Sequence, residues 1–211
     1  MMKNSCRLLL ILIGLWMANN VSIAQETFRN PIITGMNPDP SICRVGDDFY
    51  LVTSTFEYFP GLPVYHSKDL VHWKLIGHAL SRPENNPLMG CSASTGGQYA
   101  PTLRYHEGTF YVTAKNPAGP WSDPVWVGNW YVDPSIEFID GKMYFLSPDN
   151  QGSFLLGVMD PETGKFVEPL RKVAAGLGGS SPEGPHFYKM GEFYYIMSAE
   201  GGTGYEHREV I

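Results

Sequence analysis

Short apolar runs of four or five residues recur along the chain, and they are rich in Val, Ile, Phe and Tyr. Glycine and proline interrupt the chain every few residues, and no long stretch has hydrophobic residues at helical spacing. This pattern favours β-strands over helices, so we expect an all-β fold. The clearest runs are Phe49 to Thr53, Phe110 to Thr113, Met143 to Leu146 and Phe193 to Met197.

A motif that occurs four times organises these runs. Each copy has a proline at its head, a glycine six or seven residues later, and a bulky pair just beyond the glycine. Such a copy predicts a strand, a tight turn and a second strand. The four heads are Asp39-Pro40, Ala100-Pro101, Asp133-Pro134 and Glu183-Gly184-Pro185, and the four glycines are Gly46, Gly108, Gly141 and Gly191.

A second pattern extends each copy to four strands. A polar turn, an aromatic residue and another apolar run follow the hairpin, as at Trp73, Trp121 and Phe166. Repeated four-stranded units are typical of propeller blades, and we expect an incomplete propeller of about four blades. The prolines that head the second and third copies are only 33 residues apart, so the second unit is expected to lack a strand. No outer hairpin is expected after Met197. The alternative to an incomplete propeller is a complete small β domain.

The first 24 residues predict a secretory signal peptide. Lys3 and Arg7 precede an apolar run, and small residues up to Ala24 suit cleavage. Residues 25–211 would form the mature propeller domain, exported to the periplasm or the medium, without a membrane span. With 13 basic and 21 acidic residues, its charge of −8 argues against nucleic acid as a partner. Its two cysteines are Cys43 and Cys91, and the sequence leaves open whether a disulfide bond joins them.

Three of the four repeat heads carry an acid. Inner strands of a propeller end near its axis, so Asp39, Asp133 and Glu183 are expected to converge there. Clustered carboxylates perturb one another's pKa values, and glycoside hydrolysis needs one protonated and one ionised carboxyl group. Asp before Pro is also a common turn starter. The second repeat has Ala100 at the equivalent position. A need for a turn would apply to all four repeats alike, so it does not explain why three of them carry an acid.

Several ordered motifs resemble glycoside hydrolase family 43, of the β-xylosidase and α-L-arabinofuranosidase type. They match from about Asn30 to about His207, as an N-terminal, truncated portion of a family member. The motifs are Asn37-Pro38-Asp39-Pro40-Ser41-Ile42, Thr53 to Gly61, Gly97-Gln98-Tyr99-Ala100-Pro101, Val132-Asp133-Pro134-Ser135 and Pro182-Glu183-Gly184-Pro185-His186.

The resemblance implies a five-bladed propeller that hydrolyses β-xylosides, α-L-arabinofuranosides or arabinan with inversion. It makes Asp39 the general base and Glu183 the general acid, and Asp133 the residue that modulates the pKa of the acid and orients it. Family members are expected to need no cofactor, although a calcium ion can lie at the propeller axis. No metal ligands are assigned in this chain.

Three further residues are candidates for substrate binding. Phe56 and Tyr99 offer aromatic faces for a pentose ring, with ordinary packing as the alternative, and His186 lies beside Glu183. Glu200 is a weaker reserve acid, expected at the far end of its strand from Glu183.

The expected substrate is a plant-wall oligosaccharide or polysaccharide. A non-catalytic sugar-binding or inactive fragment is the alternative function, and a protein-interaction platform ranks last.

Overall fold

A computed structural model describes residues 27–85, 97–112, 117–125, 127–128 and 132–211. Residues 32–211 make up one compact unit. The expected signal peptide, residues 1–24, lies outside the described residues. Within the described part of the chain, none of the helical structure is long or apolar enough to cross a membrane.

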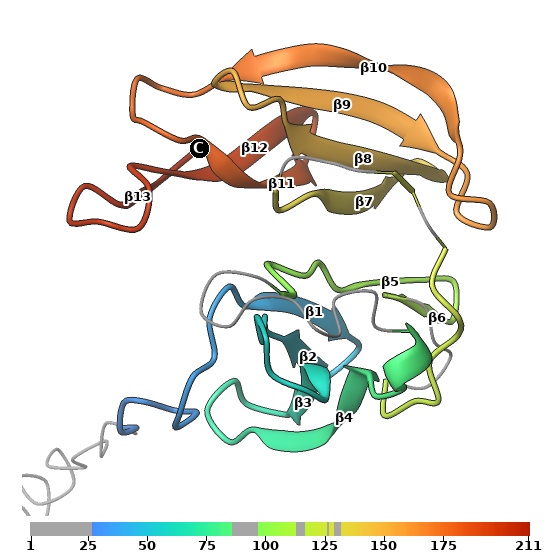
Figure 1. Ribbon diagram of the computed structural model, residues 1–211, viewed down its shortest axis with the longest axis vertical. Helices are drawn as coiled ribbons and strands as arrows, with labels where there is room; N and C mark the ends of the chain where they lie inside the picture. The colour runs from blue at the N-terminus through green and yellow to red at the C-terminus, as the bar shows by residue number, and fades with distance from the viewer. Residues whose placement is uncertain (1–26, 86–96, 113–116, 126, 129–131) are drawn as a thin grey trace, which may run out of the picture. The chain divides into compact units, whose positions relative to one another are not determined.

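The described strands form four antiparallel sheets and confirm the all-β expectation (Figure 1). The sheets have the orders β1-β2-β3-β4, β5-β6, β10-β9-β8-β7 and β11-β12-β13. The strands of the first two sheets are β1 (Ser41–Val45), β2 (Asp48–Val52), β3 (Gly61–Ser67), β4 (Lys74–Leu80), β5 (Arg104–His106) and β6 (Thr109–Tyr111). Those of the other two are β7 (Ser135–Ile139), β8 (Lys142–Pro148), β9 (Ser153–Met159), β10 (Phe166–Ala175), β11 (Glu183–Met190), β12 (Phe193–Glu200) and β13 (Arg208–Val210).

Each sheet begins with the hairpin that the repeated motif predicts. In the third sheet Ile139 pairs with Lys142, so Asp140 and Gly141 form a two-residue loop. Both loop residues have positive φ, 51° and 76°, as a type I′ turn requires. This turn suits the twist of the flanking strands, which explains why a glycine recurs at this point of the motif.

The first and third sheets each bury apolar side chains in a core. Val52 and Val64 are fully buried in the first, where Leu103 and Trp121 from the following segment pack against them. Leu146 and Phe154 lie in the core of the third sheet, in a cluster that Phe187 of β11 joins. The inner strands also touch one another, because β5 packs beside β1 and β7, and β7 packs beside β11. These contacts bring the heads of the repeats together.

In the described part of the chain, the second and fourth sheets have fewer strands than the first and third. Among the described residues the second sheet has β5 and β6, in keeping with the expected loss of a strand from the second unit. The fourth sheet gains β13, since Val210 pairs with Ser198 on the free edge of β12. A strand edge with unpaired backbone groups favours such pairing, and a three-residue strand leaves little periodicity to read in a sequence.

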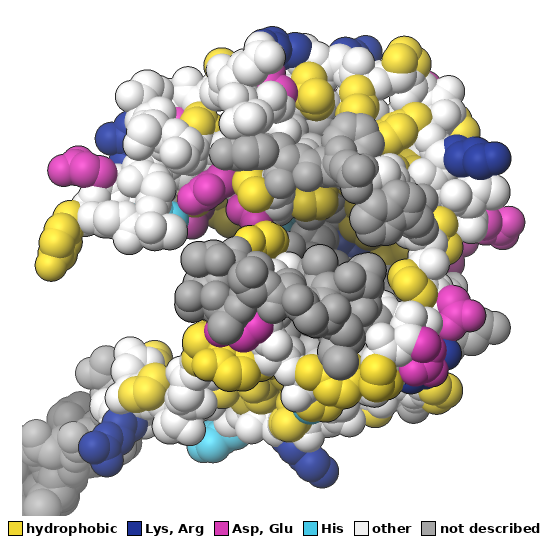
Figure 2. Space-filling model, in the orientation of Figure 1, with side chains coloured by type: hydrophobic (Ala, Val, Ile, Leu, Met, Phe, Trp, Pro, Cys, Tyr) yellow, Lys and Arg dark blue, Asp and Glu magenta, His cyan; other side chains and the backbone are white. Residues whose placement is uncertain are grey.

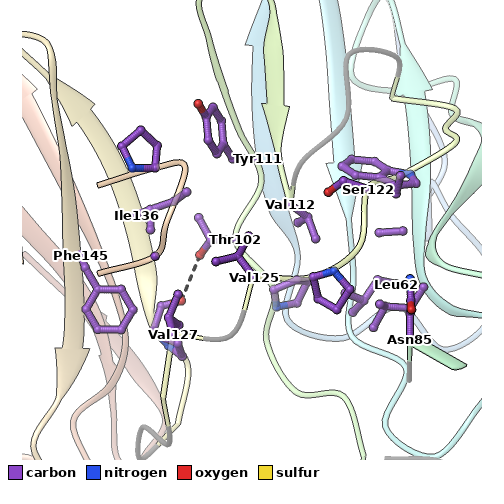
Figure 3. Close-up of a pocket in the computed structure, with 18 of the residues that line it drawn as sticks. Leu62, Asn85, Thr102, Tyr111, Val112, Ser122, Val125, Val127, Ile136 and Phe145 are labelled. Carbon is purple, nitrogen blue, oxygen red and sulfur yellow. Dashed lines mark hydrogen bonds between the residues drawn. The ribbon is translucent and has the colours of Figure 1, made fainter. Parts of the chain in front are cut away.

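An apolar cavity of about 380 Å³ lies beside the two-stranded sheet. Figure 3 shows Ile136 and Phe145 along one side, Leu62 and Asn85 along the other, and Thr102 between them. The lining is contributed mainly by the first and third sheets and by the segment after β6. The cavity therefore lies beside a sheet with two strands among the described residues, whereas the first and third sheets have four.

Candidate active site

Asp39 and Asp133 occupy equivalent, strained positions. Each stands two residues before an inner strand, β1 or β7, and each has a left-handed backbone, with φ of 52° and 47°. A side chain other than glycine costs about 1–2 kcal/mol in this conformation. Such strain persists only where the surroundings enforce it, and it concentrates at functional sites. The repeat thus presents both carboxylates through the same unusual turn.

Asp39 is exposed, and a buried hydroxyl holds its carboxylate. The Ser54 hydroxyl donates a hydrogen bond to Asp39 Oδ2 at 2.5 Å. The Ser54 backbone N–H donates to the Pro38 carbonyl at 3.0 Å, which ties the two segments together. The sequence had assigned no role to Ser54, although it belongs to the motif from Thr53 to Gly61. An ionised carboxylate that solvent reaches and a hydroxyl orients can take a proton from water.

Asp133 is the point where the three acids meet. Burial raises the pKa of Asp133 to about 6, and the negative charges of Glu183 and Asp39 add to the effect. The backbone N–H groups of Gly184 and Ala100 donate hydrogen bonds to Asp133 and lower its pKa in part. The structure therefore brings the three acids together, as the repeat predicted. Figure 2 shows acidic side chains in a recess of the visible face, next to hydrophobic ones.

Glu183 is half-buried at the first position of β11, next to the residue that binds Asp133. Gly184 has a φ of 56°, and the pairing of β11 with β12 shifts register between Glu183 and His186. A bulge of this kind bends a strand and re-aims its side chains. The irregular start of β11 thus places Glu183 within electrostatic reach of Asp133.

Phe56 and Tyr99 form an aromatic pair beside these acids. Their rings meet edge to face, with centroids 5.8 Å apart, and Tyr99 is 46% exposed. The backbones of Phe56 and Gln98 exchange hydrogen bonds of 2.9 and 3.0 Å. Phe56 lies two residues after Ser54, and Tyr99 directly precedes Ala100, so the pair borders the residues that hold Asp39 and Asp133. An exposed aromatic face here suits the apolar face of a sugar ring.

His186 is engaged by an arginine that no sequence motif had singled out. Arg104 Nη2 lies 3.1 Å from His186 Nδ1, and a guanidinium can only donate, so Nδ1 accepts. Burial, with a smaller effect of the Arg104 charge, lowers the pKa of His186 to about 4. His186 is therefore neutral near pH 7 and carries its proton on Nε2. Only Nε2 remains to donate a hydrogen bond to a ligand.

Glu200 is a structural carboxylate, and its expected location was wrong. Because Glu183 pairs with Ala199, the two acids lie at the same end of their sheet. Glu200 is 0% exposed, and the backbone N–H groups of Leu177 and Gly179 and the Arg208 side chain donate to it. A carboxylate with its oxygens occupied in this way does not exchange protons with a substrate.

Asp133→Asn is expected to stabilise the protein at pH 7.5 by about 4 °C in melting temperature. The raised pKa means that folding disfavours the ionised Asp133, so this cost is absent below pH 3.8 and is complete above about pH 6. Asn keeps an acceptor for Gly184 and Ala100 and tolerates a left-handed backbone. Thermal unfolding at pH 3.5 and 7.5 measures the effect. An equal gain at both pH values would contradict the electrostatic explanation.

The family resemblance allows a calcium ion at the propeller axis of full-length members. Within the described ranges, no group of three or more His, Cys, Asp or Glu side chains is arranged to hold a metal ion. Cys43 is a buried free thiol, and Cys91 lies outside the described residues. We therefore derive no chemical step through a metal.

Comparison with known proteins gives this acid cluster its context. The sequence profile of the glycosyl hydrolases family 43 matches residues 28–211. The chain belongs to family 43. It is 88% identical to the non-reducing end alpha-L-arabinofuranosidase BoGH43B of Bacteroides ovatus, over 100% of this chain and 43% of that protein. It is 44% identical to a xylosidase/arabinosidase of Butyrivibrio fibrisolvens, over 85% of this chain and 40% of that protein.

Solved structures of family 43 proteins agree with the fold. The structure of the Bacteroides ovatus xyloglucan PUL GH43B protein matches with a TM-score of 0.85 and 86% identity, over 88% of this chain and 40% of that chain. This chain thus spans less than half the length of these family 43 relatives. The alignment with the arabinofuranosidase runs over 227 positions and includes all 211 residues, so 16 positions of that relative have no counterpart in this chain.

Proposed function

We propose that this chain supplies the catalytic acids of an exported family 43 glycosidase. Its substrates would be pentose glycosides of the plant cell wall, namely α-L-arabinofuranosides, β-xylosides or arabinan. The observation that carries the proposal is the convergence of three carboxyl groups at Asp133, where Glu183 and Asp39 both act on its pKa. Three repeats of the chain contribute one acid each, and a pair of carboxyl groups is what glycoside hydrolysis requires.

In the proposed mechanism Asp39 is the general base. It removes a proton from a water molecule, whose oxygen attacks the anomeric carbon while the bond to the leaving oxygen breaks. Glu183 is the general acid and gives its proton to that leaving oxygen. Attack by water on the face opposite the leaving group inverts the anomeric centre. Asp133 tunes and orients Glu183, which its position beside Gly184 supports.

Substrate specificity is assigned to the aromatic pair and to His186. Phe56 and Tyr99 would stack on the pentose ring, and His186 Nε2 would donate to a sugar hydroxyl. The named activities of the relatives, an alpha-L-arabinofuranosidase and a xylosidase/arabinosidase, support a pentose in this site. The acids themselves serve as acid and base, so we propose that the reaction requires no cofactor.

We further propose that the four sheets are blades of a five-bladed propeller and that residues 1–24 direct export. The repeat of hairpins headed by β1, β5, β7 and β11 supports the radial arrangement. Such an arrangement explains why acids far apart in sequence meet, since inner strands all end around one axis.

An assay of the chain with 4-nitrophenyl α-L-arabinofuranoside and 4-nitrophenyl β-D-xylopyranoside tests the function. We expect release of 4-nitrophenol, with the arabinofuranoside hydrolysed faster. Proton NMR of the first sugar formed should show the inverted anomer. Retained configuration would contradict the assignment of Asp39 as a base that activates water.

A non-catalytic sugar-binding fragment is the second candidate. It is supported by the second sheet, which has two strands in the described part of the chain. Binding of arabinose or xylose in calorimetry, with no release of 4-nitrophenol, would favour this candidate. The absence of both sugar binding and hydrolysis would contradict both candidate functions.

A further inference from the structure

Arg104, on β5, is a buried charge at the centre of a polar cluster. Arg104 is only 8% exposed, and its guanidinium donates hydrogen bonds to three acceptors. Nε donates to Glu137 Oε2 at 2.7 Å, Nη2 donates to His186 Nδ1 at 3.1 Å, and Nη1 donates to the Leu103 carbonyl at 2.9 Å. One guanidinium therefore joins β5 to β7 and to β11.

Two of the three acids lie at the start of these strands, since Asp133 stands two residues before β7 and Glu183 is the first residue of β11. Glu137 stands four residues after Asp133 on β7, and His186 stands three residues after Glu183 on β11. At about 3.3 Å per residue, each link lies only about 10–13 Å along the strand from its acid. The distance between β7 and β11 at Glu137 and His186 therefore affects the distance between Asp133 and Glu183.

The fourth inner strand also reaches the cluster. Burial raises the pKa of the Cys43 thiol on β1, and the nearby Arg104 charge acts in the opposite direction. Tyr188, on β11, also hydrogen-bonds with Arg104. Side chains from β1, β5, β7 and β11 therefore surround a single buried cation.

The fork of an arginine is suited to this task. Its guanidinium is planar and holds five N–H groups in fixed directions, so it can keep three acceptors in one arrangement. A lysine has the same charge but is a flexible point donor that cannot reproduce the fork. Charge and geometry can therefore be separated by one substitution.

We propose that Arg104 is a positioning residue of the proposed active site, which fixes β7 against β11 and thereby sets the spacing of Asp133 and Glu183. The inference deepens the proposed function and takes its catalytic meaning from it. Arg104 acts through the strands that it joins, whereas the three acids act on the substrate.

Carbon-13 NMR titration of the Asp133 carboxyl group in Arg104→Lys tests the proposal. We expect the pKa of Asp133 to fall from about 6 by about one unit, because Glu183 is no longer held beside it. If only the charge of Arg104 mattered, the lysine would leave this pKa unchanged. Arg171→Lys, at an exposed position of β10, is the matched control and should leave the pKa where it is in the parent.

His186→Ala is the second variant, and it keeps the proposal testable if Arg104→Lys fails to fold. Because His186 is neutral near pH 7, its removal cuts one of the two side-chain links from Arg104 to β11 without a change of charge, and the pKa of Asp133 should again fall. An unchanged pKa of Asp133 in a folded variant, even with a lower melting temperature, would show a structural role only and overturn the proposal.

Hydrolysis assays separate this inference from the proposed function. In an active parent, Arg104→Lys should lower kcat about tenfold and leave KM within about twofold, since ground-state contacts remain. An inactive parent would count against the proposed function, while the titration of Asp133 would still decide the role of Arg104.

Discussion

Asp39→Asn is expected to lower kcat for 4-nitrophenyl α-L-arabinofuranoside by about 10³-fold, since a general base contributes 10²–10⁴-fold. The amide cannot take a proton from water. It should preserve the local structure, because Asn tolerates the left-handed backbone at φ 52° and can accept the hydrogen bond from Ser54. Initial rates at saturating substrate measure the loss, and thermal unfolding should show that the variant is folded.

Asp47→Asn is the matched control for this substitution. Asp47 lies in the turn between β1 and β2, and its side chain is 95% exposed. Its replacement should leave kcat within about twofold of the parent, as expected of a surface site. A loss of less than tenfold in Asp39→Asn would contradict the assignment of Asp39 as the base and would direct attention to Asp133.

Glu200→Ala is expected to lower the melting temperature by about 10 °C, a larger shift than the one expected of Asp133→Asn. The substitution leaves the N–H groups of Leu177 and Gly179 and the Arg208 side chain without their shared acceptor. These contacts join the segment before β11 to β12 and β13. Differential scanning calorimetry at pH 7 measures the change.

The contribution of Glu200 should also depend on pH. Burial alone would raise the pKa of Glu200, but the hydrogen bonds from Leu177, Arg208 and Gly179 outweigh it and lower the pKa. A lowered pKa adds stability above the ordinary value of 4.5, and this stability is lost as pH falls through the folded value. The difference between parent and Glu200→Ala should therefore shrink in acid.

Glu192→Ala serves as the control for Glu200→Ala. Glu192 is exposed in the turn between β11 and β12, and its loss should change the melting temperature by no more than about 2 °C. If Glu200→Ala and Glu192→Ala unfolded at the same temperature, the buried carboxylate would not be structural, and its place as a reserve acid would have to be reconsidered.

The sequence was sufficient to predict the hairpins and the meeting of the acids, because both follow from a repeat. A glycine at a fixed distance from a proline encodes the turn locally, and equivalent positions in successive hairpins coincide in space. The convergence of Asp39, Asp133 and Glu183 could therefore be predicted from their equivalent positions in the repeat.

The roles of Ser54, Arg104 and Glu200 could not be predicted in this way. Each role depends on a hydrogen-bond partner that is between 8 and 82 residues away in the sequence. Only the packing of the folded chain brings these partners together. A lone arginine in a strand looks like a surface residue, since arginines are seldom buried without a partner. β13 could not be predicted either, because a three-residue strand carries almost no periodic signal.

The cavity beside the two-stranded sheet has a consequence for the stability of the fold. It is open to solvent and its lining is mainly apolar, so side chains such as Val125, which is 46% exposed, stay in contact with water. These side chains contribute less of the free energy that burial in a closed core would give.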